Sequence, residues 1–137
     1  MTRSGYEICH DNDDLIRYQV ALEWEIKCGR GQAFLRELLT ALDALPEKAL
    51  IKNDFTAEGW VCALGAVFAA RGVAPPENGI NDAACVAADA LGIPGILAAE
   101  VMYKNDDCGP PREIPGRRWK RVREWVEKSL LQEGRIL

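Results

Sequence analysis

The residues of this 137-residue chain that could carry chemistry are few, and its cysteines come first. No two of them have the CxxC spacing of a zinc site, so we expect no metal centre built on thiolates. An odd, scattered set is typical of reduced thiols in the cytosol, several of them buried as small hydrophobic residues. The five are Cys9, Cys28, Cys62, Cys85 and Cys108.

Cys62 is the only cysteine in a recognisable motif, and it lies near the start of an expected helix, where the helix dipole lowers the pKa of a thiol. A catalytic thiol also needs a base, and the sole histidine, His10, lies far away in the N-terminal arm. The neighbours of Cys62 are small and apolar, which indicates close packing. We therefore expect a buried, structural Cys62, with a catalytic thiol as the open alternative.

Three further segments have a functional and a structural interpretation. Asn105-Asp106-Asp107 could form a metal or acid–base site with Glu100, but without a nearby histidine a helix end with an Asx-turn is favoured. Residues 11–14 have the acidic alternation of a calcium loop, but Leu15 and Ile16 occupy positions where such a loop needs an oxygen ligand and a glycine. The segment fits a helix N-terminus better. Gly29-Arg30-Gly31 lacks the Lys-Ser/Thr of a phosphate loop and reads as a hinge. We expect no catalytic residue, no metal and no cofactor.

A basic segment near the C-terminus is the strongest candidate for binding. Residues 112–128 hold seven basic and three acidic residues, a local charge of +4 within a chain of net charge −4. Such a surface attracts phosphates or an acidic protein, although it is also compatible with a solvated helix face. We expect Arg117, Lys120 and Arg121 to share a face. The predicted binding residues are Arg117, Arg118, Lys120, Arg121 and Arg123.

The composition is that of one globular domain. Hydrophobic residues make up 48% and charged residues 28% of the chain. No apolar run approaches the roughly 20 residues of a membrane span, and residues 1–4 lead into no apolar signal segment. We therefore expect a cytoplasmic protein.

Hydrophobic periodicity predicts a mainly α fold, with an irregular acidic arm over residues 1–13 and one helical domain over residues 14–133. In the first helix, Leu15, Tyr18, Leu22 and Ile26 form the inner stripe, and Val20, Ala21 and Trp24 widen it. The expected helices are 14–27, 32–45, 61–71, 83–91, 94–103 and 116–132.

The stretch from Gly59 to Gly72 is expected to be central, as a short strand that leads into a helix closed by Gly72. Residues 49–52 and 60–62 are compatible with a small β-hairpin. Leu38 and Leu42 lie on the apolar face of the most regular helix, which we expect to be the main buried one. The glycines at 29–31 suggest that the first two helices form an antiparallel hairpin.

Several segments in order resemble a family of small uncharacterised proteins found in bacteriophages and prophages. The likeness covers roughly residues 15–130 and supplies no reaction and no catalytic residues. It implies an accessory protein of phage type that acts in a bacterial cytoplasm. The segments are Gly31–Leu39, Ala41–Lys48, Cys62–Ala66, Asn105-Asp106 and Arg118–Val126.

From these observations we expect a small, non-enzymatic protein that binds a host protein or protein complex. Inhibition of a host defence complex, as by an anti-CRISPR protein, is one role that this context implies. The alternative is a nucleic-acid-binding accessory factor that uses the basic C-terminal helix. An enzyme built on Cys62 or on the Asp106 region is the third class.

Overall fold

The computed structural model describes residue 3 and residues 12–131. Within this part of the chain it has six α-helices and one two-stranded antiparallel sheet, which confirms the predicted mainly α fold. The expected arm over residues 1–13 lies largely outside the described residues, and Asn12 and Asp13 belong to the first helix. The elements are α1 (Asn12–Lys27), α2 (Gly29–Ala44), β1 (Thr56–Ala57), β2 (Trp60–Val61), α3 (Ala63–Arg71), α4 (Ala83–Leu91), α5 (Gly95–Asp106) and α6 (Pro115–Ser129).

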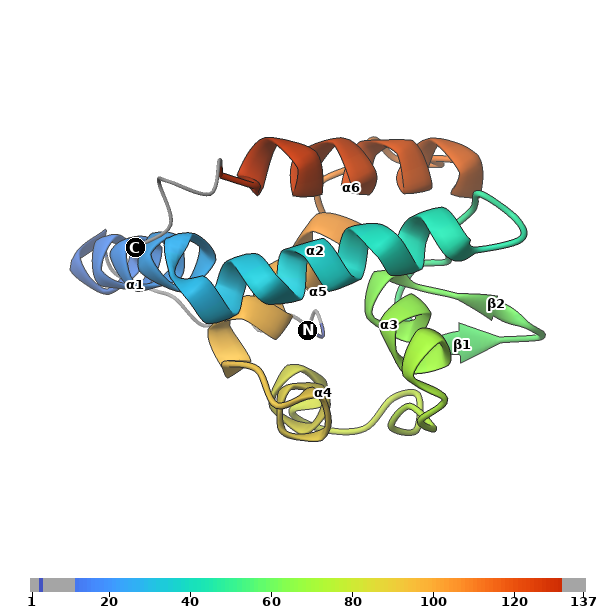
Figure 1. Ribbon diagram of the computed structural model, residues 1–137, viewed down its shortest axis with the longest axis horizontal. Helices are drawn as coiled ribbons and strands as arrows, with labels where there is room; N and C mark the ends of the chain where they lie inside the picture. Colours follow the sequence, from blue (N-terminus) through green and yellow to red (C-terminus); the bar gives the residue numbers. More distant parts are fainter. Residues whose placement is uncertain (1–2, 4–11, 132–137) are drawn as a thin grey trace.

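α2 crosses the middle of the molecule, with α6 along one side of it and α3 along the other (Figure 1). Its apolar face is fully buried at Leu35, Leu38 and Leu42, as the leucine spacing predicts. From α6, Val122 and Val126 complete this core. α1, α3 and α6 pack against α2, whereas α4 packs against α5.

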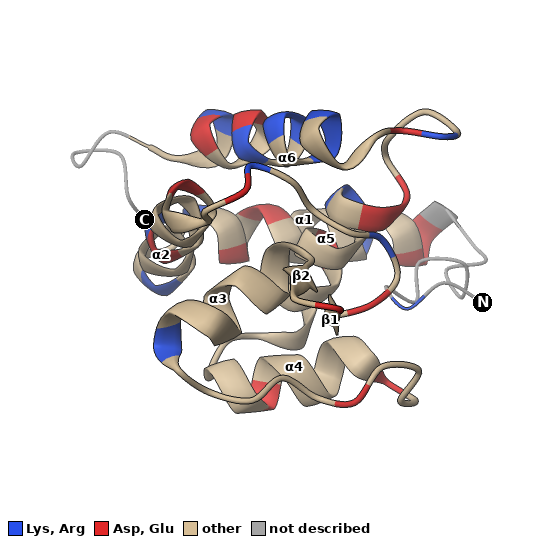
Figure 2. Cartoon of the chain, turned by 90° about the vertical axis from the view of Figure 1, so that its right-hand side faces the viewer, with Lys and Arg blue, Asp and Glu red and all other residues tan. Residues whose placement is uncertain are grey.

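α1 and α2 meet at a sharp corner, and the predicted antiparallel hairpin is wrong (Figures 1 and 2). Only Cys28 separates the two helices, whereas an antiparallel helical hairpin needs a loop of about two to five residues. Gly31 lies so close to the end of α1 that a Cβ there would stand 1.7 Å from the carbonyl oxygen of Glu25. The two glycines therefore lie in the first turn of α2 and allow its backbone to contact the end of α1. Arg30, between them, forms an ion pair with Glu25 of α1.

The stretch from Gly59 to Gly72 has the predicted strand-to-helix order, with β2 followed by α3 and with Gly72 in the left-handed region at φ 69°. The hairpin is shorter than expected: β2 lies in the predicted second strand, residues 60–62, whereas β1 lies in the segment between the two predicted strands and not in residues 49–52. Thr56 pairs with Val61 and Ala57 with Trp60. Glu58 and Gly59 both have positive φ, as the tight turn between the strands requires.

The last three helices differ in how well their ends are predicted. α4 has the expected bounds and ends at Gly92, while Asp82 before it has φ 54° and makes no side-chain cap. α5 runs three residues further than expected, so Asn105 and Asp106 lie in its last turn and the predicted Asx-turn loop there is wrong. α6 ends at Ser129, three residues before the predicted end.

No single helix among the described residues has both the length and the apolar character to cross a membrane. Among these residues, only α4 and α5 taken together meet both criteria, and the two helices are bent by 119° relative to each other.

Candidate functional site

Cys62 is buried as predicted, with 1% of its surface exposed. It precedes the first residue of α3 in an extended conformation, and its Sγ accepts a hydrogen bond from the backbone N–H of Gly65 at 3.4 Å. The thiol thus caps α3 in the way that a serine or aspartate oxygen usually does. A substrate cannot reach this sulfur without movement of the surrounding chain.

Asn105 connects the end of α5 to the segments around the β-hairpin. Its side-chain oxygen accepts from the backbone N–H of Ala63 at 3.0 Å, and its Nδ2 donates to the carbonyl of Ile51 and to Asp106 Oδ1, both at 2.8 Å. One amide thus makes hydrogen bonds to a backbone N–H, a backbone carbonyl and a carboxylate oxygen. Asn105 is therefore a positioning residue in the core.

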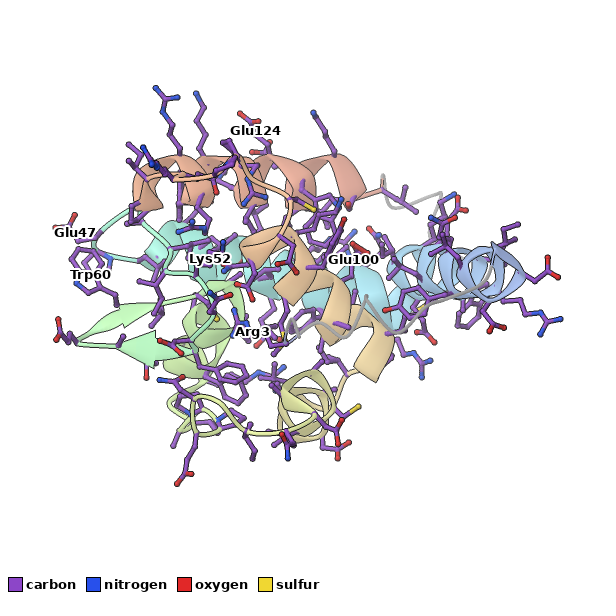
Figure 3. All side chains as sticks on the ribbon, turned by 180° about the vertical axis from the view of Figure 1, so that it is seen from behind. Arg3, Glu47, Lys52, Trp60, Glu100 and Glu124 are labelled. Carbon is purple, nitrogen blue, oxygen red and sulfur yellow. The ribbon has the colours of Figure 1, made fainter. Side chains whose placement is uncertain are left out.

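Asp106 is a buried carboxylate, with 1% of its side chain exposed. Arg3 forms a two-pronged ion pair with it, from Nε to Oδ2 and from Nη2 to Oδ1. The Cζ of Arg3 also lies 5.2 Å from the ring centre of Phe55. Figure 3 shows Arg3 between α5 and the β-hairpin, and 11% of its side chain is exposed.

Burial opposes the charge of Arg3, but the hydrogen bonds to Asp106 and the charges of Cys62 and Asp106 outweigh it and raise the pKa of the guanidinium. The fold thus brings together Cys62 and Asp106, which the sequence offered as separate candidates. Arg3, which joins them, has no sequence signal of its own. We name Arg3, Phe55, Cys62, Asn105 and Asp106 the Arg3 cluster.

The other acidic candidates do not join this cluster. Glu100 lines a groove between α1 and α5 together with Leu15, Tyr18 and Leu22, away from Asp106. His10 and Asp11 lie outside the described residues. Among residue 3 and residues 12–131, no three His, Cys, Asp or Glu side chains are placed to hold a metal ion together.

The five predicted basic residues of α6 separate into inward and outward groups. Arg118 is 7% exposed, donates to the carbonyl of Leu50 at 3.0 Å and lies 3.4 Å from Glu113 Oε1. Arg121 donates to both Glu113 oxygens, at 2.7 and 2.9 Å, and to two carbonyls at the end of α5. The expectation that Arg121 shares an open face with Arg117 and Lys120 is therefore wrong, because Glu113 draws it toward α5.

Arg117 and Lys120 are exposed on α6, and Arg123 is paired with Asp43 and Glu127. Arg123, Asp43 and Lys120 line a shallow groove beside Trp119, whose indole N–H donates to the carbonyl of Leu42 at 2.9 Å. Figure 2 shows that the first half of α6 carries only basic charges and that its second half, from Glu124 on, carries acidic and basic ones together. The outward charge of this helix is thus mixed rather than uniformly basic.

α1 carries an exposed apolar surface that was not predicted from the sequence. Ile16, Val20 and Trp24 expose 57%, 64% and 54% of their surfaces, so the prediction that Val20 and Trp24 widen the inner stripe is wrong. Their spacing of four residues was the available signal, because it places them on one face, opposite Tyr18 and Leu22. We name Ile16, Val20 and Trp24 the outer α1 stripe.

Comparison of the chain with protein-family models, with curated proteins and with solved structures found no match.

Proposed function

We propose that this protein is a non-enzymatic interaction protein that binds another protein through the outer α1 stripe. Three large apolar side chains on one helix face are the observation that supports it. Exposed hydrophobic residues are ordinary when scattered, whereas a contiguous row of them is typical of a surface that a partner covers. An accessory role of phage type in a host-cell cytoplasm, such as inhibition of a defence complex, requires a surface of this kind.

The charges beside the outer α1 stripe favour a protein as the partner. Arg17 is exposed next to the stripe, and Glu23 and Lys27 form an ion pair along it. An apolar centre with a rim of both signs matches the anatomy of protein interfaces. A nucleic acid would instead require a rim of positive charge. We therefore assign the stripe to an apolar face of a host protein, and self-association to an outcome of the test.

The arrangement around Cys62 disfavours an enzyme. The thiol is enclosed, and Asp106 is engaged by Arg3 and Asn105. A general acid or base must reach the proton that it transfers, which neither side chain does in this arrangement.

The experiment compares a double variant, Ile16→Ser with Val20→Ser, with the matched control Val73→Ser, which alters an exposed aliphatic residue elsewhere. A partner is first captured from nuclease-treated host lysate and purified. Its affinity is then measured by calorimetry. We expect the double variant to bind at least about tenfold more weakly, or about 1.4 kcal/mol, with an unchanged melting temperature and with wild-type affinity for the control.

Equal affinity for the double variant and wild type would refute the proposal. If the protein dimerises through α1 as its concentration rises, a second copy of the chain covers the outer α1 stripe. Capture that disappears with nuclease would favour the second candidate, a nucleic-acid-binding factor that uses α6. The exposure of Arg117 and Lys120 is the observation in favour of that candidate.

A further inference from the structure

The Asp106 carboxylate is oriented by groups of the folded body, independently of Arg3. Its Oδ1 accepts from the backbone N–H of Asn53 at 3.1 Å and from Asn105 Nδ2 at 2.8 Å. Asn105 is in turn fixed by Ala63 and Ile51. A carboxylate with 1% of its side chain exposed needs a positive partner, because an unpaired buried charge is costly.

The surroundings of Asp106 fit a guanidinium group better than an ammonium group. The carboxylate presents both oxygens to one planar fork, and the Phe55 ring lies beside the same group, with the Arg3 Cζ 5.2 Å from its centre. A guanidinium makes two parallel hydrogen bonds and contacts an aromatic ring at once, whereas a lysine ammonium is a point charge.

The groups that form this site and the group that fills it come from distant parts of the chain. The site is formed by residues between positions 53 and 106, namely Asn53, Phe55 and Asp106. Arg3 lies 103 positions before Asp106 in sequence. Nη1 of Arg3 is buried and makes no hydrogen bond with any described residue. The fit of Arg3 therefore leaves one donor unsatisfied, at a cost of about 1–3 kcal/mol.

We propose that Asp106 and Phe55 form a binding site for a guanidinium group, which Arg3 fills within the chain. When Arg3 is displaced, an arginine side chain from another polypeptide takes the same place. The ligand class is thus an arginine-bearing peptide, and Arg3 is its internal competitor. This site is separate from the outer α1 stripe, and neither proposal depends on the other.

The test is chemical rescue of full-length Arg3→Ala. Loss of Arg3 leaves Asp106 without its partner, so we expect a lower melting temperature. Millimolar ethylguanidinium should then raise it along a saturating curve, because a ligand of the native state stabilises by mass action. Ethylammonium at equal concentration should have a smaller effect, and N-acetylarginine amide should reproduce the rescue.

Three controls separate binding from general stabilisation. Wild type should respond much less than Arg3→Ala at the same ethylguanidinium concentration, because the ligand must first displace Arg3. The double variant Arg3→Ala with Asp106→Asn should lose the rescue. Labelling of Cys62, located by mass spectrometry, should be at least about tenfold faster in Arg3→Ala, a change of about 1.4 kcal/mol, and ethylguanidinium should slow it.

If Arg3→Ala does not fold by itself, recovery of its helical circular dichroism by ethylguanidinium, compared with ethylammonium at equal concentration, supplies the same test. Equal stabilisation by ethylguanidinium and ethylammonium would overturn the proposal. A melting temperature of Arg3→Ala equal to that of wild type would also overturn it, since Asp106 would then need no guanidinium.

Discussion

At the scale of single residues, two enclosed carboxylates are each held by arginine, one at either side of the α5–α6 connection. Asp106 pairs with Arg3, and Glu113, with 4% of its side chain exposed, pairs with Arg121 and Arg118. Hydrogen bonding to Arg121 is the largest cause that lowers the pKa of Glu113 below its usual value of 4.5.

This shift makes the contribution of Glu113 to stability depend on pH. A carboxyl group whose pKa is lowered on folding stabilises the native state above its unfolded pKa, and the contribution is lost as pH falls through the folded value. At pH 7 we expect Glu113→Gln to cost about 1–3 kcal/mol, the range for a lost hydrogen bond to a buried charged group. The gap should begin to narrow below pH 4.5, and the two proteins should converge only once the pH has fallen below the lowered pKa of folded Glu113, where the wild-type side chain is neutral as well.

Denaturant unfolding at several pH values between 7 and 3 measures this difference. A gap between wild type and Glu113→Gln that is the same at every pH would mean that the pKa of Glu113 is not lowered by folding.

At the scale of elements, close backbone contact decides how α3 meets the β-hairpin. A Cβ on Gly65 would lie 2.2 Å from the carbonyl oxygen of Phe55, the same oxygen that accepts from the N–H of Cys62 at 3.1 Å. The small-residue run after Cys62 indicates such an approach, although it does not say which backbone approaches.

Gly65→Ala should therefore destabilise the fold by about 1–3 kcal/mol, as overpacking of a close-packed core does. Gly95→Ala is the matched control, because its Cβ would meet only Cys85 Sγ at 3.8 Å. Alanine has a helix propensity up to about 1 kcal/mol better than glycine, so the control should be neutral or stabilising. Thermal unfolding compares the two; equal losses of stability would show that the Gly65 contact is not tight.

At the scale of the whole molecule, the arrangement of charge matters more than its sum. The basic excess of residues 112–128 suggests one positive face, but α6 turns Arg118 and Arg121 toward Glu113 and leaves Arg117 and Lys120 outside. Net charge alone therefore does not describe the surface that a partner meets.

Two double variants with the same change of net charge test this division. Arg117→Glu with Lys120→Glu should alter stability by less than about 0.5 kcal/mol, as surface substitutions usually do. Arg118→Glu with Arg121→Glu should cost about 3–5 kcal/mol, because it places negative charges beside Glu113. Circular dichroism during thermal unfolding measures both, and similar losses for the two pairs would show that net charge governs stability.

The sequence by itself determined the helical fold. Local pattern predicts the periodicity of α2 and α6 and the breaks at Gly72 and Gly92. It also predicts that Leu38 and Leu42 lie in the core. It also indicated that Cys62 is buried, from its small neighbours. These features depend on residues near one another in the chain.

Only the tertiary structure decided which polar residues are surface and which are interior. Arg118 and Arg121 are drawn inward by Glu113, Asp106 is paired by Arg3, and α5 continues to Asp106 because both of its last side chains are satisfied by other segments. The direction of α1 depends on contact with α2 and α5, so its outward stripe was also hidden from periodicity. A charged or apolar side chain takes its partner from whatever the fold brings near, and that partner is distant in sequence.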